Sequence, residues 1–424
     1  MKKKSIFSFV LALCMLVPAC FMLTACKKDN ANEQKHEFVA DWTYSETEHW
    51  HKCKDENCSE VSDKGEHQSD TWIVDAEATC LEDGQRHQEC VICGYSFNRE
   101  SIPHTGHNCG SDHICTICGG LEEGYVAKVS NVDAAAVAFT TFDEALTQLK
   151  DNGTLTLYAD VTVKNGAEEG NYFEIGERTD KENKTIKTYT IDFGGHTLTS
   201  KKGGFDLYAN LTLKNGKMVA EARNGIWVQN DAHLKIERDA TVECIYNDVK
   251  DEGANYAVVA TQGAVVDVYG TVHSVYGTAL SGNGTSGLGG IVCNIHDGAV
   301  VKSDKNVAVY MPNSRELNFL GGTVTGTTAV YIKSGTTTIS GGTFDATLET
   351  KADYLHNGNG CDATGDTIVI EACGYPGGNP VINITGGTFN KVAEGAVRVA
   401  YYTFEENEAV AINIAPSLGI EVNK

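Results

Sequence analysis

Two short motifs in the chain pair cysteines with a following glycine: Cys90-Val91-Ile92-Cys93-Gly94 and Cys115-Thr116-Ile117-Cys118-Gly119. In a C-x-x-C-G turn, two thiolates face one metal ion, and the glycine lets backbone N–H groups approach the sulfurs. Zinc is usually held by four nitrogen or sulfur ligands in a tetrahedron, so each pair needs two partners. The motifs therefore predict zinc knuckles.

Nearby cysteines and histidines can supply the missing ligands. For Cys90 and Cys93 we expect Cys80 with either His104 or His107. The wider pair is expected to close with two histidines, as Cys53 and Cys58 with His67 and either His49 or His51. The last pair is expected to close as Cys115 and Cys118 with Cys109 and either His113 or His107. Because each site would have four protein ligands, we expect about two or three structural zinc ions and no catalytic one.

The segment 36–119 has the composition of a small stapled module. It holds eight of the 15 cysteines and eight of the 13 histidines but only ten Val, Ile and Leu residues. Such a small core usually needs metal ions or disulfides. Disulfides remain an alternative because the number of cysteines is even, but they do not account for the histidines. The segment resembles C-x-x-C-G and His-Trp repeats that precede other domains in bacterial surface proteins, although the Cys53–Cys58 pair is wider.

The first 26 residues have the features of a targeting segment. Lys2, Lys3 and Lys4 precede an apolar stretch that ends in Leu23-Thr24-Ala25-Cys26. This end resembles a bacterial lipobox, which implies a lipid on Cys26 and a membrane-anchored protein facing the extracellular side. A short polar linker, 27–35, follows. Removing the three lysines lowers the formal charge from −23 to −26, which disfavours nucleic acid as a partner.

Most of the remaining chain repeats a unit of alternating apolar and polar residues followed by two glycines. The clearest copies contain Gly321-Gly322, Gly341-Gly342 and Gly386-Gly387. Alternation indicates a half-buried strand, and recurrence at a short period indicates a solenoid. The central polar residues of the copies are Thr156, Asp192, Thr212, Lys235, Asp267, Asn294, Asn318, Thr338, Asn383 and Asn413.

We therefore predict an all-β fold for 120–424, a right-handed parallel β-helix with an N-terminal capping helix near 141–152. Thr141-Phe142-Asp143-Glu144 reads as a capping box that starts this helix. The sequence from Phe139 to Val161, together with Ile191–Leu198, resembles pectin-lyase-like β-helices of bacterial surface proteins. That resemblance specifies the fold far better than an activity.

A second strand also recurs, and its middle residue should point outward. Stacked coils would then align Trp227, Tyr310, Tyr331 and Arg398 on one external face, where aromatic rings and a guanidinium suit sugar binding. Tyrosines also flank many sheets without binding anything. In the insertion 348–380, Cys361 and Cys373 could form a disulfide that pins the insertion, and buried free thiols are the alternative.

The sequence favours a non-enzymatic surface lipoprotein that presents a β-helix to glycan or protein partners. No residue is predicted to be catalytic, because none of the arginines in the coils stands beside an obvious cluster of acids. A polysaccharide lyase or glycoside hydrolase of the pectin-lyase-like group remains the alternative, since two carboxylates could align across coils. A purely structural surface stalk is the third interpretation.

Overall fold

The structure is a computed structural model that describes residues 35–163, 172–178, 185–247, 255–351, 360–391, 395–401 and 410–423. Cys26 and the targeting segment lie outside these ranges. The chain divides into two compact units, residues 1–105 and 106–424. Among the described residues, no helix is long and apolar enough to cross a membrane.

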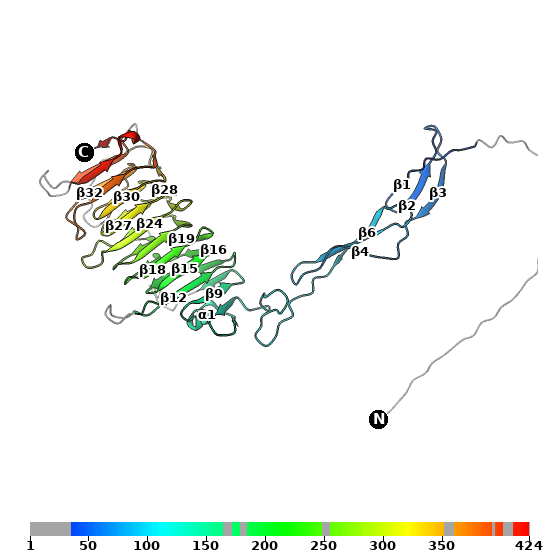
Figure 1. Ribbon diagram of the computed structural model, residues 1–424, viewed down its shortest axis with the longest axis horizontal. Helices are drawn as coiled ribbons and strands as arrows, with labels where there is room; N and C mark the ends of the chain where they lie inside the picture. Colours follow the sequence, from blue (N-terminus) through cyan, green and yellow to red (C-terminus); the bar gives the residue numbers. More distant parts are fainter. Residues whose placement is uncertain are drawn as a thin grey trace, which may run out of the picture. The chain divides into compact units, whose positions relative to one another are not determined.

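The first unit contains two antiparallel sheets of three strands each (Figure 1). One sheet comprises β1 (Thr43–Tyr44), β2 (Glu48–Lys52) and β3 (Val61–Glu66). The other comprises β4 (Ile73–Ala76), β5 (Gly84–Glu89) and β6 (Ser96–Ile102). Its described buried hydrophobic side chains are Cys80 and Cys90 alone, so this unit has almost no ordinary apolar core.

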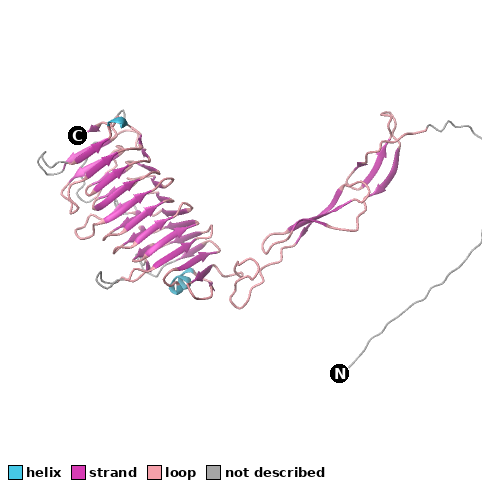
Figure 2. Ribbon diagram, viewed as in Figure 1, coloured by secondary structure: helices cyan, strands magenta, loops and turns pink. Residues whose placement is uncertain are grey.

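The second unit is built from three long sheets, which we call sheets 1, 2 and 3 (Figure 2). Sheet 1 has the order β36 (Ala411–Ile414), β33 (Val381–Ile384), β30 (Thr336–Ile339), β27 (Ser314–Phe319), β24 (Ile291–Ile295), β21 (Val265–Val268), β18 (His233–Ile236), β15 (Asn210–Lys214), β12 (Thr188–Asp192), β9 (Gly153–Leu157), β7 (Ala127–Ser130) and β8 (Val137–Phe139).

Sheet 2 has the order β10 (Val161–Val163), β13 (Thr197–Ser200), β16 (Gly216–Ala220), β19 (Ala240–Cys244), β22 (Thr271–Ser274), β25 (Val300–Ser303), β28 (Thr323–Gly326), β31 (Thr343–Ala346) and β34 (Thr388–Phe389). Sheet 3 has the order β11 (Phe173–Ile175), β14 (Phe205–Leu207), β17 (Asn224–Val228), β20 (Tyr256–Ala260), β23 (Thr278–Gly282), β26 (Val309–Met311), β29 (Val330–Ile332), β32 (Ile368–Ala372), β35 (Val397–Tyr401) and β37 (Val422–Asn423).

Neighbours in these sheets are mostly three strands apart in sequence and run parallel, so the chain visits the three sheets in turn. This all-β architecture is consistent with a parallel β-helix. One continuous core runs through it, because alternate residues of each strand, such as Leu211 and Leu213 of β15, are buried. The second glycine of each Gly-Gly pair has a positive φ, +78° at Gly322 and +101° at Gly342, a conformation that favours glycine.

The predicted alignment of the central polar residues of the repeat copies is largely confirmed. The eight residues from Thr212 to Asn413 occupy matching positions on successive strands of sheet 1. Asp192, however, pairs with Thr156 and Lys214, whereas Thr212 pairs with Thr190. The two earliest members are therefore displaced by two residues from the rest of the row.

The predicted helix exists as α1 (Phe142–Gln148) and is shorter than expected. Its N-cap is confirmed, since the Thr141 side chain accepts a hydrogen bond from the backbone N–H of Glu144 at 3.3 Å. Phe142 and Ala145 are fully buried in the same core as the strands. Figure 1 shows α1 beside β9, at one end of the stacked strands.

A row of side chains on sheet 3 also aligns as predicted. Tyr310 pairs with Tyr331, which pairs with Val369, which in turn pairs with Arg398, and Trp227 lies farther along the same row. The residues flanking each central position are buried, as the alternation requires. The expected exposure of the row is wrong at its centre, where Tyr310 is 5 % and Tyr331 0 % exposed.

Candidate metal centres

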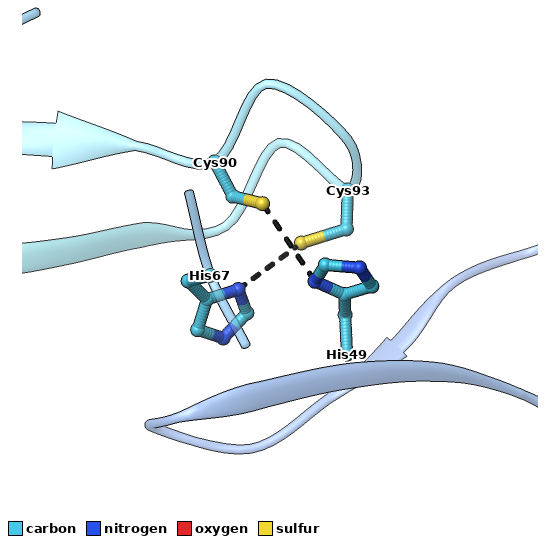
Figure 3. A group of neighbouring side chains, drawn as sticks. All are labelled: His49, His67, Cys90 and Cys93. Atoms are coloured by element: carbon cyan, nitrogen blue, oxygen red, sulfur yellow. Dashed lines mark hydrogen bonds between the residues drawn. The ribbon is translucent and has the colours of Figure 1, made fainter. Parts of the chain in front are cut away.

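Four side chains in the first unit form a group that could bind one metal ion: His49, His67, Cys90 and Cys93 (Figure 3). Their ligand atoms all lie within 4.8 Å of one another. Cys90 Sγ is 3.7 Å from His49 Nδ1, and Cys93 Sγ is 3.5 Å from His67 Nδ1. Zinc bonds of about 2.3 Å to sulfur and about 2.0–2.1 Å to nitrogen, at tetrahedral angles, separate the two atoms by about 3.5 Å. The group therefore already has the spacing of a tetrahedral site.

The strands explain how these four residues meet. His49 lies in β2, where alternation turns it inward to 2 % exposure opposite Gly65 of β3. His67 directly follows β3, and Cys90 directly follows β5. Two separate sheets therefore each contribute one half of the ligand set.

Backbone geometry at the cysteine pair is that of a knuckle. Gly94 has φ +72° and donates its N–H to the Cys90 carbonyl at 2.8 Å. Burial acts to raise the pKa of Cys90, but hydrogen bonds that include those from the backbone of Gln68, Cys93 and Ile92 outweigh it and lower that pKa to about 6. A thiolate is the form that binds metal, so one ligand is ready near neutral pH. Burial and the neighbouring Cys90 raise the pKa of Cys93.

A hydrogen bond outside the ligand set fixes the ring of His67. His67 Nε2 lies 3.0 Å from the carbonyl oxygen of Ser45, which can only accept, so Nε2 carries the proton. The lone pair of Nδ1 then faces Cys93. Metal-binding histidines typically donate their other ring N–H to a carbonyl or carboxylate in this way. His67 also stacks on Tyr95, and His49 packs edge-on against Trp42.

The second knuckle lies in the second unit and repeats this geometry. Gly119 has φ +73° and donates to the Cys115 carbonyl at 2.9 Å. Cys118 Sγ lies 3.3 Å from His107 Nδ1. The pKa of Cys115 falls to about 5, chiefly through a backbone hydrogen bond from Cys118 and against the effect of burial. His107, Cys115 and Cys118 therefore supply at least three close ligands.

A third group, on the surface of the first unit, comprises His36, Cys53 and Cys58. His36 Nδ1 lies 3.1 Å from Cys58 Sγ and 3.9 Å from Cys53 Sγ. His36 was not expected as a ligand. It lies 17 residues before Cys53, with no spacing motif to mark it, and only the pairing of Phe38 with Cys53 brings it close.

His107 was among the partners that the sequence suggested for Cys115 and Cys118, but most other partners of the cysteine pairs differ from those suggested. Cys90 and Cys93 meet His49 and His67, whereas Cys80 is buried apart from that pair and His104 binds Asp83 at 2.8 Å. His113 binds Glu122 at 2.6 Å and stacks on Tyr125. Cys109 pairs with Cys115 through the backbone and joins none of the groups found among the described residues.

No protein family, curated protein or solved structure matches this chain. The three groups of cysteines and histidines can hold metal ions, and the first has four ligands within one compact unit.

The centre of the candidate sugar-binding row on sheet 3 forms part of a second small apolar cluster. Val307, Tyr310, Tyr331 and Val369 pack together there, with Cys361 of the insertion against them. At the end of the row, Arg398 Nε binds Asp366 at 2.5 Å. Cys361 and Cys373 are both free thiols, so the disulfide does not form. Burial raises their pKa values to about 12 and about 11.

Two carboxylates lie in register at the other end of sheet 3. Glu174 of β11 pairs with Asp206 of β14, and Asp206 pairs with Trp227 of β17. Burial raises the pKa of Asp206, and the negative charge of Glu174 adds to that effect. Gln229 donates a hydrogen bond of 2.6 Å to the Asp206 carboxylate. Glu174 and Asp206 are therefore two carboxylates aligned across coils, the arrangement that the sequence left open without naming its residues.

Proposed function

We propose that this chain is a non-enzymatic lipoprotein, anchored through Cys26 to the outer face of a membrane, that presents a right-handed parallel β-helix to glycan ligands. The observation that carries the proposal is a second layer of side chains outside sheet 3, in which Cys361 of the insertion packs against Val307, Tyr310, Tyr331 and Val369. A solenoid does not need this layer for its own stacking, and solenoids usually carry their function on such insertions. The lipobox-like leader supports the location, and the strongly acidic chain disfavours a nucleic-acid partner.

We also infer that the ion in the His49, His67, Cys90 and Cys93 group is structural zinc. Two thiolates and two imidazoles form a common structural zinc set, and four protein ligands leave no position open for a substrate. The bond between His67 and Ser45 supports metal over a Cys90–Cys93 disulfide, because a disulfide would need neither histidine. Helix α1 would act as the cap of the β-helix, since Phe142 packs its ring near Phe173 and Phe205 in the core.

A polysaccharide lyase or hydrolase remains the second candidate because of Glu174 and Asp206. Neighbouring strands lie about 4.8 Å apart, which is near the separation of about 5–5.5 Å between the carboxyl groups of retaining glycosidases. The raised pKa of Asp206 suits an acid, and Trp227 beside it suits a sugar ring.

The two candidates are separated by incubating the chain, without its leader, with a panel of polysaccharides. We expect binding of at least one glycan and no new reducing ends or unsaturated products. Products that disappear in Glu174→Gln and Asp206→Asn, with losses of about 10²-fold or more, would establish the enzyme instead. Asp239→Asn, at an exposed turn, is the matched control. Absence of both binding and products would favour the structural stalk.

A further inference from the structure

Two side chains on the outward-facing side of sheet 3 form an ion pair that is fully buried from solvent. Lys333, directly after β29, and Glu371 of β32 are both 0 % exposed, and Lys333 Nζ lies 3.5 Å from Glu371 Oε2. The hydroxyl of Tyr331 donates to the same carboxylate oxygen. Lys333 Nζ also lies 5.8, 5.7 and 5.2 Å from the ring centres of Tyr310, Tyr331 and Tyr375.

Stability alone does not explain this arrangement. Removing two charges from water costs about as much as their attraction returns, and a well-packed apolar pair often serves stability equally well. What the ion pair does provide is orientation. The ammonium group holds three tyrosine rings around it, and one carboxylate fixes both the ammonium and the Tyr331 hydroxyl.

Two of these tyrosines form walls of a pocket of about 170 Å³. Tyr256 forms a third wall, and Asn283 and Thr285 add an amide and a hydroxyl. Hydrogen bonds join the hydroxyl of Tyr310 to Tyr375 and that of Tyr256 to Ser281. Gly284 leaves room for the Tyr375 ring, since a Cβ on it would lie 2.2 Å from that ring.

The size and chemistry of the pocket limit its ligand. Its volume lies below the range of about 300–1,000 Å³ that is typical of pockets for drug-sized molecules, so it suits a single ring. None of the described residues that line it carries a charge, which disfavours uronic acids, phosphates and amines. Aromatic faces with a few hydroxyl and amide groups match the apolar faces and hydroxyls of a sugar.

We propose that this tyrosine pocket binds one neutral sugar ring, as the terminal unit of a glycan. The proposal rests on the proposed glycan-binding function and assigns it a site. The insertion supplies Tyr375, the loop after β23 supplies Asn283 and Thr285, and the coil row supplies Tyr310. The buried ion pair beneath then positions the rings before the ligand arrives, which lowers the entropic cost of binding.

The test is a glycan array followed by titration calorimetry with the terminal monosaccharides of whatever binds. The wild-type chain, Tyr375→Ala, Asn283→Ala and the control Tyr276→Ala are compared, Tyr276 being 41 % exposed and outside the pocket. We expect affinity to fall about tenfold or more in the two pocket variants and to be unchanged in the control. Circular dichroism should show that all four proteins remain folded.

Two other results would overturn the proposal, and they differ in what they leave standing. If the wild type binds a glycan and both pocket variants bind it equally well, the pocket is not the site, although the proposed function survives. If the wild type binds no glycan of any kind, the pocket and glycan presentation fail together, whereas binding of charged glycans alone removes only the pocket. If Asn283→Ala keeps its binding and Tyr375→Ala loses it, the result would support the pocket as the binding site, with the ring of Tyr375 as the main contact.

Discussion

Replacing Cys93 with serine is expected to unfold the first unit and to release one zinc ion per chain. The described buried hydrophobic residues of this unit are two cysteines, so it has little other than the metal to hold its two sheets together. Structural zinc contributes an apparent binding free energy of about 10–16 kcal/mol at neutral pH. A disulfide in the same place would contribute only about 2–4 kcal/mol. Elemental analysis and near-ultraviolet circular dichroism, which reports the packing of Trp42, would measure both effects.

His104→Gln is the matched control for this experiment. The sequence places His104 within reach of the same cysteine pair, but its ring binds the exposed Asp83 instead. We expect this variant to keep its metal and its fold. Release of the ion by His104→Gln, or retention of both the ion and the tertiary signal by Cys93→Ser, would contradict the proposed metal site.

Replacing Phe344 with alanine is expected to destabilise the second unit by about 3–5 kcal/mol. Its ring is fully buried and contacts Phe319 and Phe389 of the adjoining coils, with ring centres 5.0 and 4.9 Å apart. A coil of a solenoid is stabilised mainly by its neighbours, so the cavity would weaken two interfaces at once. Denaturant unfolding followed by far-ultraviolet circular dichroism would report the change.

Thr325→Ala is the control, because Thr325 lies on the outward side of the neighbouring strand β28. Surface substitutions of this kind usually change stability by less than about 0.5 kcal/mol. A loss below about 1 kcal/mol in Phe344→Ala, similar to that of the control, would show that the phenylalanine stack does not hold the coils together.

The repeat could be predicted from the sequence because its signal is local. Alternation assigns each residue of a strand to the inner or outer face, and this assignment was correct for strands β17, β26, β29 and β35. The register of the earliest coils was missed for a related reason. A shift of two residues preserves the faces, so the pattern around Asp192 fits either pairing and only the contacts with the next coil decide.

The choice of metal ligands and the burial of Tyr310 and Tyr331 depend on contacts between residues that are far apart in the sequence. The two cysteines of each knuckle were evident because the turn itself brings them together. His49 and His67 meet Cys90 from a different sheet, across 41 and 23 residues, and no spacing rule covers such distances. Tyr331 was correctly predicted to point outward from sheet 3. Its burial was not predicted, because Cys361 of the insertion packs against its cluster through contacts that are distant in sequence.

Zinc K-edge X-ray absorption would test the central metal centre most directly, in a chain whose Cys53, Cys58, Cys115 and Cys118 are replaced by serine. We predict one bound zinc with two sulfur neighbours at about 2.3 Å and two nitrogen neighbours at about 2.0–2.1 Å. A chain that binds no zinc and has a Cys90–Cys93 disulfide would contradict the account, as would a zinc surrounded by oxygen alone.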